Sequence, residues 1–268
     1  MFDPAALYDD LRAESDELDR LVENLSETDW ARPTPAPGWT VAHQIAHLAW
    51  TDRSAWLAAT DPTSFRADVA EAEAREIDLA AAVDQAAEAA VRAMTPAELL
   101  ARWRDTREQV QEVLRAAPPG ARHPWYGPPM SAPSMATARL METWAHGQDI
   151  ADALGVSREP TARLRHVARI GSRARDYAYA AHGERPPDEE FRVELTAPDG
   201  GLWTYGPESA AQKVTGPALD FCLLTTQRAH RADLAVVAEG PDADHWLDIA
   251  QAFAGPPGPG RAPCGRRA

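Results

Sequence analysis

The feature that most constrains this sequence is a helical periodicity that runs through its first two thirds and then stops. Between residues 5 and 25, apolar side chains recur at intervals of three, four and seven residues, at Leu7, Leu11, Leu18, Val22 and Leu25. This spacing places them on one face of an amphipathic helix. Later, the segment "FRVELTAPDGGLWTYG" alternates apolar and polar residues around an Asp-Gly-Gly turn, which is typical of a β-hairpin. The sequence therefore predicts a helical region followed by a smaller α+β region.

Start and stop signals divide the helical region. Thr40 is a plausible N-cap, Thr95 is followed by proline in a first turn, and Gly155 is placed to end a helix. The acidic, alanine-rich stretch 67–94 has strong helix propensity and few large apolar residues, which predicts one helix with a thin buried face. The predicted helices cover residues 5–25, 40–58, 67–94, 95–114, 134–154 and 161–182.

Three regions follow from this pattern. Residues 1–185 are predicted to form a helical bundle, and residues 190–255 a small α+β domain in which "ALDFCLLTTQRAH" and "ADHWLDIAQAFAG" are helices and "DLAVVAEG" a strand. Residues 256–268, rich in proline, glycine and arginine, are predicted to be a disordered tail.

Composition excludes several classes of protein. The net charge of −14 disfavours a general nucleic-acid or anionic-membrane surface, because phosphates would be repelled. No apolar run approaches the roughly 20 residues that span a bilayer, and the start "MFDPAALYDD" lacks the basic segment of a signal peptide. The two cysteines, Cys222 and Cys264, lie in unlike contexts, so a disulfide framework is not expected. We expect a cytoplasmic protein without nucleic-acid or membrane partners.

Two short motifs carry metal-binding residue types at helical spacing. In "GWTVAHQIAHLAW", His43 and His47 lie four residues apart, and in "METWAHGQDIADAL", Glu142 and His146 do the same. Residues four apart share a helix face. Together the two helices could supply two imidazoles and a carboxylate, a set that suits zinc with an open fourth position or another divalent metal. Each pair alone could equally be surface residues or a helix-stabilising pair.

The combination "PTPAPGWTVAHQIAHLAW" and "METWAHGQDIADAL" resembles the DinB-like metal-binding bundles, and more narrowly the mycothiol-dependent maleylpyruvate isomerase family. The resemblance covers about residues 5–180 and is looser over 190–255. It implies a mainly α fold, a DinB-like four-helix bundle with a small C-terminal α+β domain. It also implies a metal triad of His47, Glu142 and His146, a divalent metal with zinc expected, and mycothiol or a similar thiol as cosubstrate.

The resemblance assigns less to other residues. A catalytic arginine of the family maps to Arg228 in "LLTTQRAHRADL", for which a surface position is the alternative. His43 could support the metal site, contact substrate or lie on the surface. Asp149 could orient His146 through its second ring nitrogen or be a solvated helix residue. Trp125 and Tyr126, in a proline-rich loop, could line the site or serve as packing anchors.

The implied reaction is thiol chemistry on an electrophilic small molecule. A metal-activated thiolate could isomerise the substrate by addition and elimination, or remain attached to it as an S-conjugate. Two alternatives stay open. The first is a DinB-like metal-binding protein without catalysis, acting in stress or small-molecule binding. The second is a hydrolase in which zinc-bound water replaces the thiol. No sequence feature decides whether the chain forms a homodimer.

Overall fold

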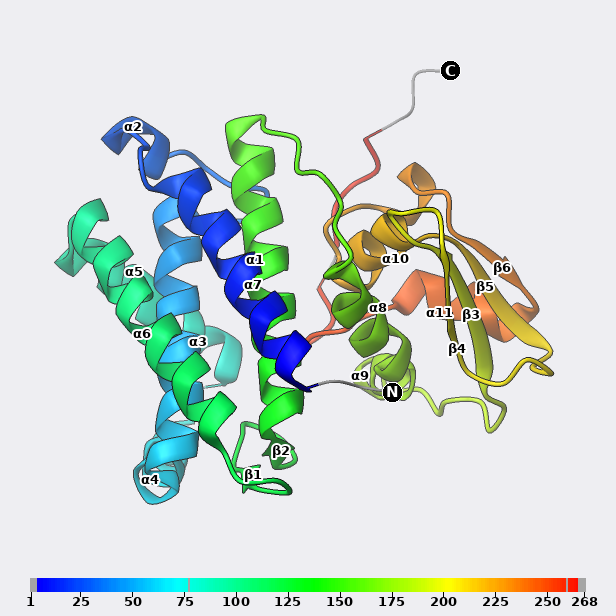
Figure 1. Cartoon of the computed structure of the whole chain (residues 1–268), viewed down its shortest axis with the longest axis horizontal. Helices are drawn as coiled ribbons and strands as arrows, with labels where there is room; N and C mark the ends of the chain where they lie inside the picture. Colours follow the sequence, from blue (N-terminus) through cyan, green and yellow to red (C-terminus); the bar gives the residue numbers. More distant parts are fainter. Residues whose placement is uncertain (1–3, 77, 259, 265–268) are drawn as a thin grey trace. The chain divides into compact units, whose positions relative to one another are not determined.

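The computed structural model describes residues 4–76, 78–258 and 260–264, and divides the chain into two compact units, Met1–Arg158 and Glu159–Ala268 (Figure 1). The first unit is helical and the second combines helices with a four-stranded sheet. This agrees with the predicted mainly α bundle followed by a small α+β region. The first unit ends before α8 (Leu164–Arg173) and α9 (Arg175–Ala181), which the sequence analysis had assigned to the bundle.

Four long helices form the body of the first unit: α1 (Pro4–Val22), α3 (Val41–Thr60), α6 (Pro96–Ala116) and α7 (Ala132–Leu154). α3 packs against both α6 and α7, and α1 packs against α7. Thr95 caps α6 through a reciprocal capping box with Glu98, and Gly155 ends α7 in the left-handed conformation with φ 69°. The core of the four-helix bundle contains the fully buried side chains of Leu18, Ile45 and Trp103.

Shorter elements complete the first unit. They are α2 (Glu27–Trp30), α4 (Pro62–Ala74), α5 (Leu79–Ala93) and the two-residue strands β1 (Arg122–His123) and β2 (Met130–Ser131), which pair antiparallel. The single helix predicted over 67–94 is wrong, because the chain breaks between α4 and α5. Glu76 has φ 56°, and Asp78 accepts a hydrogen bond from the Ala81 amide as the N-cap of a new helix. The high alanine content favours helix on both sides of this break, but it does not keep the two helices continuous.

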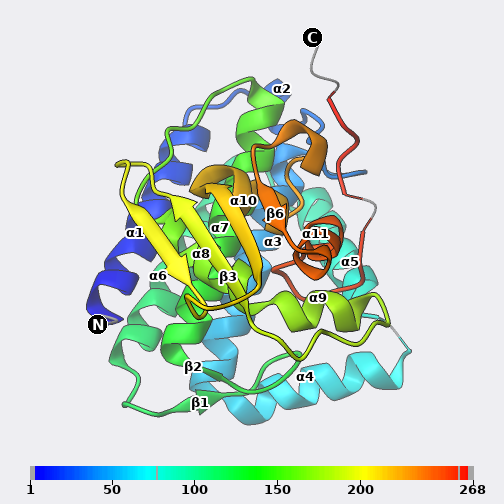
Figure 2. The same ribbon diagram turned by 90° about the vertical axis from the view of Figure 1, so that its right-hand side faces the viewer.

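The second unit contains a mixed sheet of order β4-β3-β5-β6. Its strands are β3 (Phe191–Thr196), β4 (Leu202–Tyr205), β5 (Gln212–Pro217) and β6 (Val237–Glu239), with β3 and β5 parallel and the other pairs antiparallel. Figure 2 looks onto this sheet, with α8 and α10 (Ala218–Thr225) behind it. The buried side chains of Phe191, Val193 and Leu195 alternate along β3, as the predicted hairpin required. α11 (Pro241–Ile249) packs on β5 and β6.

Strand β5 was not predicted from the sequence, and one predicted helix is shorter in the structure. "ALDFCLLTTQRAH" is helical only to Thr225, and the backbone turns at Gln227, with φ 58°. The predicted tail, 256–268, lies partly outside the described residues, and its described part contains no helix or strand. Within the described ranges, no helix is both long and apolar enough to cross a bilayer.

Candidate metal centre

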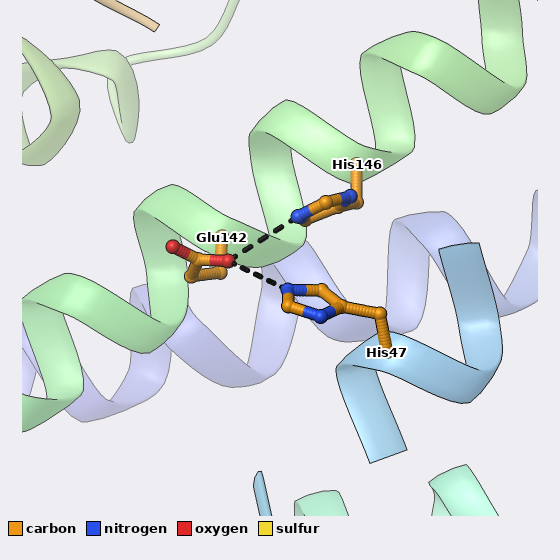
Figure 3. A group of neighbouring side chains, drawn as sticks. All are labelled: His47, Glu142 and His146. Atoms are coloured by element: carbon orange, nitrogen blue, oxygen red, sulfur yellow. Dashed lines mark hydrogen bonds and ion pairs between the residues drawn. The ribbon is translucent and has the colours of Figure 1, made fainter. Parts of the chain in front are cut away.

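Helices α3 and α7 bring three metal-ligating side chains together in the first unit. Glu142 and His146 lie one turn apart on α7, and His47 faces them from α3 (Figure 3). Glu142 Oε2 lies 3.1 Å from His47 Nε2 and 3.2 Å from His146 Nε2. One ligand atom from each residue lies within 4.8 Å of the other two. These are the three residues that the resemblance had singled out.

The electrostatics of the cluster favour an ionised carboxylate. Burial alone would raise the pKa of Glu142, but hydrogen bonds with His146 and His47 and the positive charge of Arg139 outweigh it, so its pKa lies well below the usual value. Glu142 is therefore a negatively charged oxygen donor next to two imidazole nitrogens. Two nitrogens and one carboxylate oxygen form a donor set that fits zinc or a similar divalent ion, with further coordination positions left for another ligand.

A buried glutamine orients one ligand. His146 Nδ1 is hydrogen-bonded to Gln44 Oε1, and Gln44 Nε2 donates to Thr34 Oγ1 over 2.9 Å. An amide oxygen only accepts, so this bond places a proton on Nδ1 and leaves Nε2 as the ring nitrogen that could bind a metal ion. Such outer partners fix the tautomer and direction of a ligating histidine. Gln44 takes the place that the sequence analysis offered to Asp149, which is buried rather than solvated.

Aromatic rings hold the other ligand. The His47 ring lies 5.3 Å from the Trp39 ring and 6.5 Å from the Trp50 ring, measured between centroids. Trp39 also stacks on His146 at 6.0 Å, and its indole N–H donates to Asp84. Among the described residues, His47 Nδ1 is buried without a hydrogen-bond partner. Packing against indoles, rather than a second hydrogen bond, therefore fixes the direction of His47.

His43 lies outside the cluster and has a structural role. Its Nδ1 accepts a hydrogen bond from the Thr40 backbone amide, over 3.2 Å, at the start of α3. Its Nε2 lies 2.9 Å from Glu88 Oε2 on α5. His43 thus closes the first turn of α3 and ties α3 to α5. The spacing of the two histidines could not separate these roles, because both point from the same side of one helix.

Arg228, Arg231 and Cys222 belong to the second unit. Arg228 Nη1 donates to the Thr226 carbonyl within this unit, so its catalytic assignment stays a prediction. Arg231 pairs with Asp244 and Asp248. Cys222 is fully buried, and burial raises the pKa of its thiol, which agrees with a packing role.

Two buried charges near the triad had no signal in the sequence. Asp52 on α3 is 4% exposed, and burial raises its pKa to about 6, although the positive charge of Arg139 opposes the shift. Arg139, one turn before Glu142 on α7, is equally buried and lies 5.5 Å from the Trp125 ring centroid. Asp52 lies beside Thr51, Arg53 and Ser54 in the sequence, a polar neighbourhood that ordinarily indicates a side chain facing water.

Comparison with known families identifies the class of protein. Residues 11–151, more than half of the 268 residues, match the family described as the mycothiol maleylpyruvate isomerase N-terminal domain. The chain therefore belongs to this family. Residues 187–239 match a second family model, described as wyosine base formation.

Individual relatives agree with this placement. An uncharacterized protein from Mycobacterium tuberculosis, found in strains CDC 1551 / Oshkosh and H37Rv, is 57% identical over 261 residues, which cover 97% of this chain and all of that protein. The crystal structure of the mycothiol-dependent maleylpyruvate isomerase shares the fold, with a TM-score of 0.60 and 16% identity over 90% of this chain and 96% of that one. A histidine-to-alanine mutant of the same enzyme matches equally well, at 15% identity.

Proposed function

We propose that this chain is a metal-dependent enzyme that uses a low-molecular-weight thiol, such as mycothiol, to isomerise or S-conjugate an electrophilic small molecule. The observation that carries the proposal is the convergence of His47, Glu142 and His146 from two packed helices. Membership of a family described by mycothiol and maleylpyruvate isomerase supports the choice of thiol chemistry.

The chain's own residues have separable roles in this proposal. Glu142 and the two histidines would hold a divalent ion, and Gln44 keeps the His146 lone pair directed at it. Trp39 and Trp50 cover His47 with indole rings and limit the access of water from those sides. A bound divalent ion, with zinc expected, would lower the pKa of an adjacent thiol and favour thiolate at neutral pH.

The bond changes distinguish two outcomes. The thiol releases its proton, and its sulfur forms a C–S bond at an electrophilic carbon–carbon double bond. In isomerisation, rotation follows, the C–S bond breaks, the double bond re-forms and the thiol is recovered unchanged. In S-conjugation, the carbanion formed next to the new C–S bond takes up a proton, and the thiol is consumed. Measuring thiol concentration together with product therefore separates an isomerase from a transferase.

The first test is metal content, measured by elemental mass spectrometry on the purified protein after incubation with zinc. We expect near-stoichiometric metal in the wild type and in His43→Ala, and its loss in His47→Ala. His43→Ala is the matched control, because it removes the same side chain one turn away on α3. A wild type that binds no divalent metal would contradict the enzymatic proposal and favour a binding protein on the same fold.

Turnover tests the thiol. With metal bound, we expect consumption or isomerisation of an activated alkene only when mycothiol is present. Thiol-independent hydrolysis would instead support a zinc-bound water as the nucleophile. Arg228→Ala tests the arginine assigned by resemblance. We expect it to lower turnover and leave metal content unchanged, whereas unchanged turnover would remove Arg228 from the site.

A further inference from the structure

The first unit contains a cavity that is suited to a small molecule and is separate from the metal ligands. It has a volume of about 490 Å³ and is bounded by α3, α4, α5, α6 and the loop between β1 and β2. This volume lies within the range of roughly 300–1,000 Å³ that is usual for small-molecule sites. His47, Glu142 and His146 do not line it. It is therefore a neighbouring site rather than part of the metal centre.

The walls of this cavity combine aromatic rings with aliphatic side chains. Trp50, Phe65 and Tyr126 supply three rings. Tyr126 lies 5.7 Å from the Trp50 ring and 5.2 Å from the Phe65 ring, and its hydroxyl group donates to Ser54 Oγ. The α5 side contributes Leu79 and Ala82. A flat aromatic group would thus find aromatic rings and aliphatic side chains to pack against.

Trp50 connects this cavity to the metal centre. Its ring stacks on Tyr126 inside the cavity, and it also stacks on the His47 ring, with an interplanar angle of 26°. One side chain therefore borders both places. A ligand whose ring lies against Trp50 would have its remaining atoms within a short reach of the metal ligands.

The charge on the cavity wall selects among aromatic ligands. Arg53, Asp68, Glu73 and Asp78 line the cavity but are exposed, so water screens them. Arg102 is the half-buried charged group of the lining. In the part of the chain that the structure describes, Arg102 forms no ion pair with a carboxylate, and the contact found for its guanidinium is a weak one to Met94 Sδ at 4.0 Å. A guanidinium group without a carboxylate partner can bind the carboxylate of a ligand by donating hydrogen bonds to it.

We propose that this cavity binds an aryl carboxylate, with the ring packed against Trp50, Phe65 and Tyr126 and the carboxylate on Arg102. In the context of the proposed function, which it extends, the cavity would hold the aromatic body of the electrophile beside the metal centre. Binding itself requires neither metal nor thiol.

The test uses three probes of one shape and different charge: 2-naphthylacetate, 2-naphthylacetamide and 2-naphthylethylamine. Dissociation constants are measured by NMR titration of the indole N–H signal of Trp50, assigned with Trp50→Phe. Zinc-free wild type and His47→Ala are used, so that a carboxylate cannot bind through the metal. We expect the anion to bind best and the amine worst. Tightest binding of the amine would mean that the exposed carboxylates of the lining, Asp68, Glu73 and Asp78, determine which probe binds, and would overturn the proposal.

Two variants locate the site. Arg102→Gln should weaken the anion about tenfold and the amide little, because a charge-assisted hydrogen bond is lost. Arg92→Gln is the charge-matched control, since Arg92 is exposed on α5 and paired with Glu88. Ala82→Leu fills the cavity and should weaken all three probes. Binding that survives Ala82→Leu places the ligand elsewhere. Normal probe binding by a protein that takes up no metal would leave this proposal standing while the proposed function failed.

Discussion

Gln44 lies between the two histidines of one motif, and its importance comes from a contact with another helix. Its amide oxygen accepts from His146 Nδ1, so we expect Gln44→Leu to weaken zinc binding by about 10- to 100-fold. Competition with a chromophoric chelator measures the change. Gln148→Leu is a matched control, because the hydrogen bond that Gln148 donates goes to Asp152 within α7. Equal zinc affinities for Gln44→Leu and wild type would show that Gln44 does not orient the ligand.

His43 should affect stability rather than metal. It accepts a hydrogen bond from the Thr40 amide and contacts Glu88, so we expect His43→Ala to lower the free energy of unfolding by about 1–2 kcal/mol. Urea denaturation of the zinc-free protein measures this directly. Zinc affinity should be unchanged. Weaker zinc binding without a loss of stability would place His43 in the metal centre after all.

Asp52 should make the stability of the protein depend on pH. Its pKa is raised by burial from 3.8 to about 6, so the folded state binds this proton more tightly than the unfolded state. Its contribution to stability is therefore present below pH 4 and is lost as pH rises to about 6. The stability of Asp52→Asn relative to wild type should increase by about 2 kcal/mol between pH 4 and pH 7. The measurement is urea unfolding of both proteins across this range. A constant difference would show that Asp52 titrates normally.

The contact of α8 with α10 in the second unit depends on a glycine. A Cβ atom at Gly171 would lie 2.7 Å from Thr225 Oγ1, and Thr225 is completely buried. We expect Gly171→Ala to destabilise the protein by about 1–3 kcal/mol because the helices must separate or Thr225 must move. Adding Thr225→Ala should recover part of the loss. Gly127→Ala is the control, since nothing lies within 4 Å of its added Cβ. Thermal unfolding compares the stabilities of the four proteins. An unchanged stability of Gly171→Ala would show that α10 can move away from α8 at little cost.

Helix ends were predictable where one or two neighbouring residues determine them. Thr40 and Thr95 precede α3 and α6, and Gly155 follows α7, because capping depends on local backbone geometry. The break between α4 and α5 and the strand β5 were not predictable in this way. β5 is stabilised by pairing with β3 and β6, and its own sequence, "QKVTGP", has little alternation.

The candidate site was predictable in part for the same reason. Glu142 and His146 belong to one helix, so their spacing alone places them side by side. The choice of His47 over His43 came from family resemblance, since spacing treats both alike. Gln44 and Trp39 act through partners on α7, about a hundred residues away in sequence. No local pattern encodes such contacts, which arise only when the bundle packs.

The chain divides into two compact units, and we expect zinc to stabilise only the first of them. The triad lies wholly in the first unit, so a ligand there favours the folded state of α3 and α7 by mass action. With free zinc at 100 times its dissociation constant, we expect the slowest-exchanging amides of α3 and α7 to gain about 100-fold protection. Amides of β3 and β5 should gain none, because their opening does not require release of the metal.

Native-state hydrogen exchange followed by mass spectrometry measures both sets of amides in one experiment, with His47→Ala as the control that should show no zinc effect. The comparison separates two physical pictures of the chain. An increase confined to the first unit would mean that each core unfolds on its own, so that metal loss loosens the bundle and leaves the sheet intact. An equal increase in β3 and β5 would mean that the chain opens as one cooperative body, and the division at Arg158 would then have no energetic meaning.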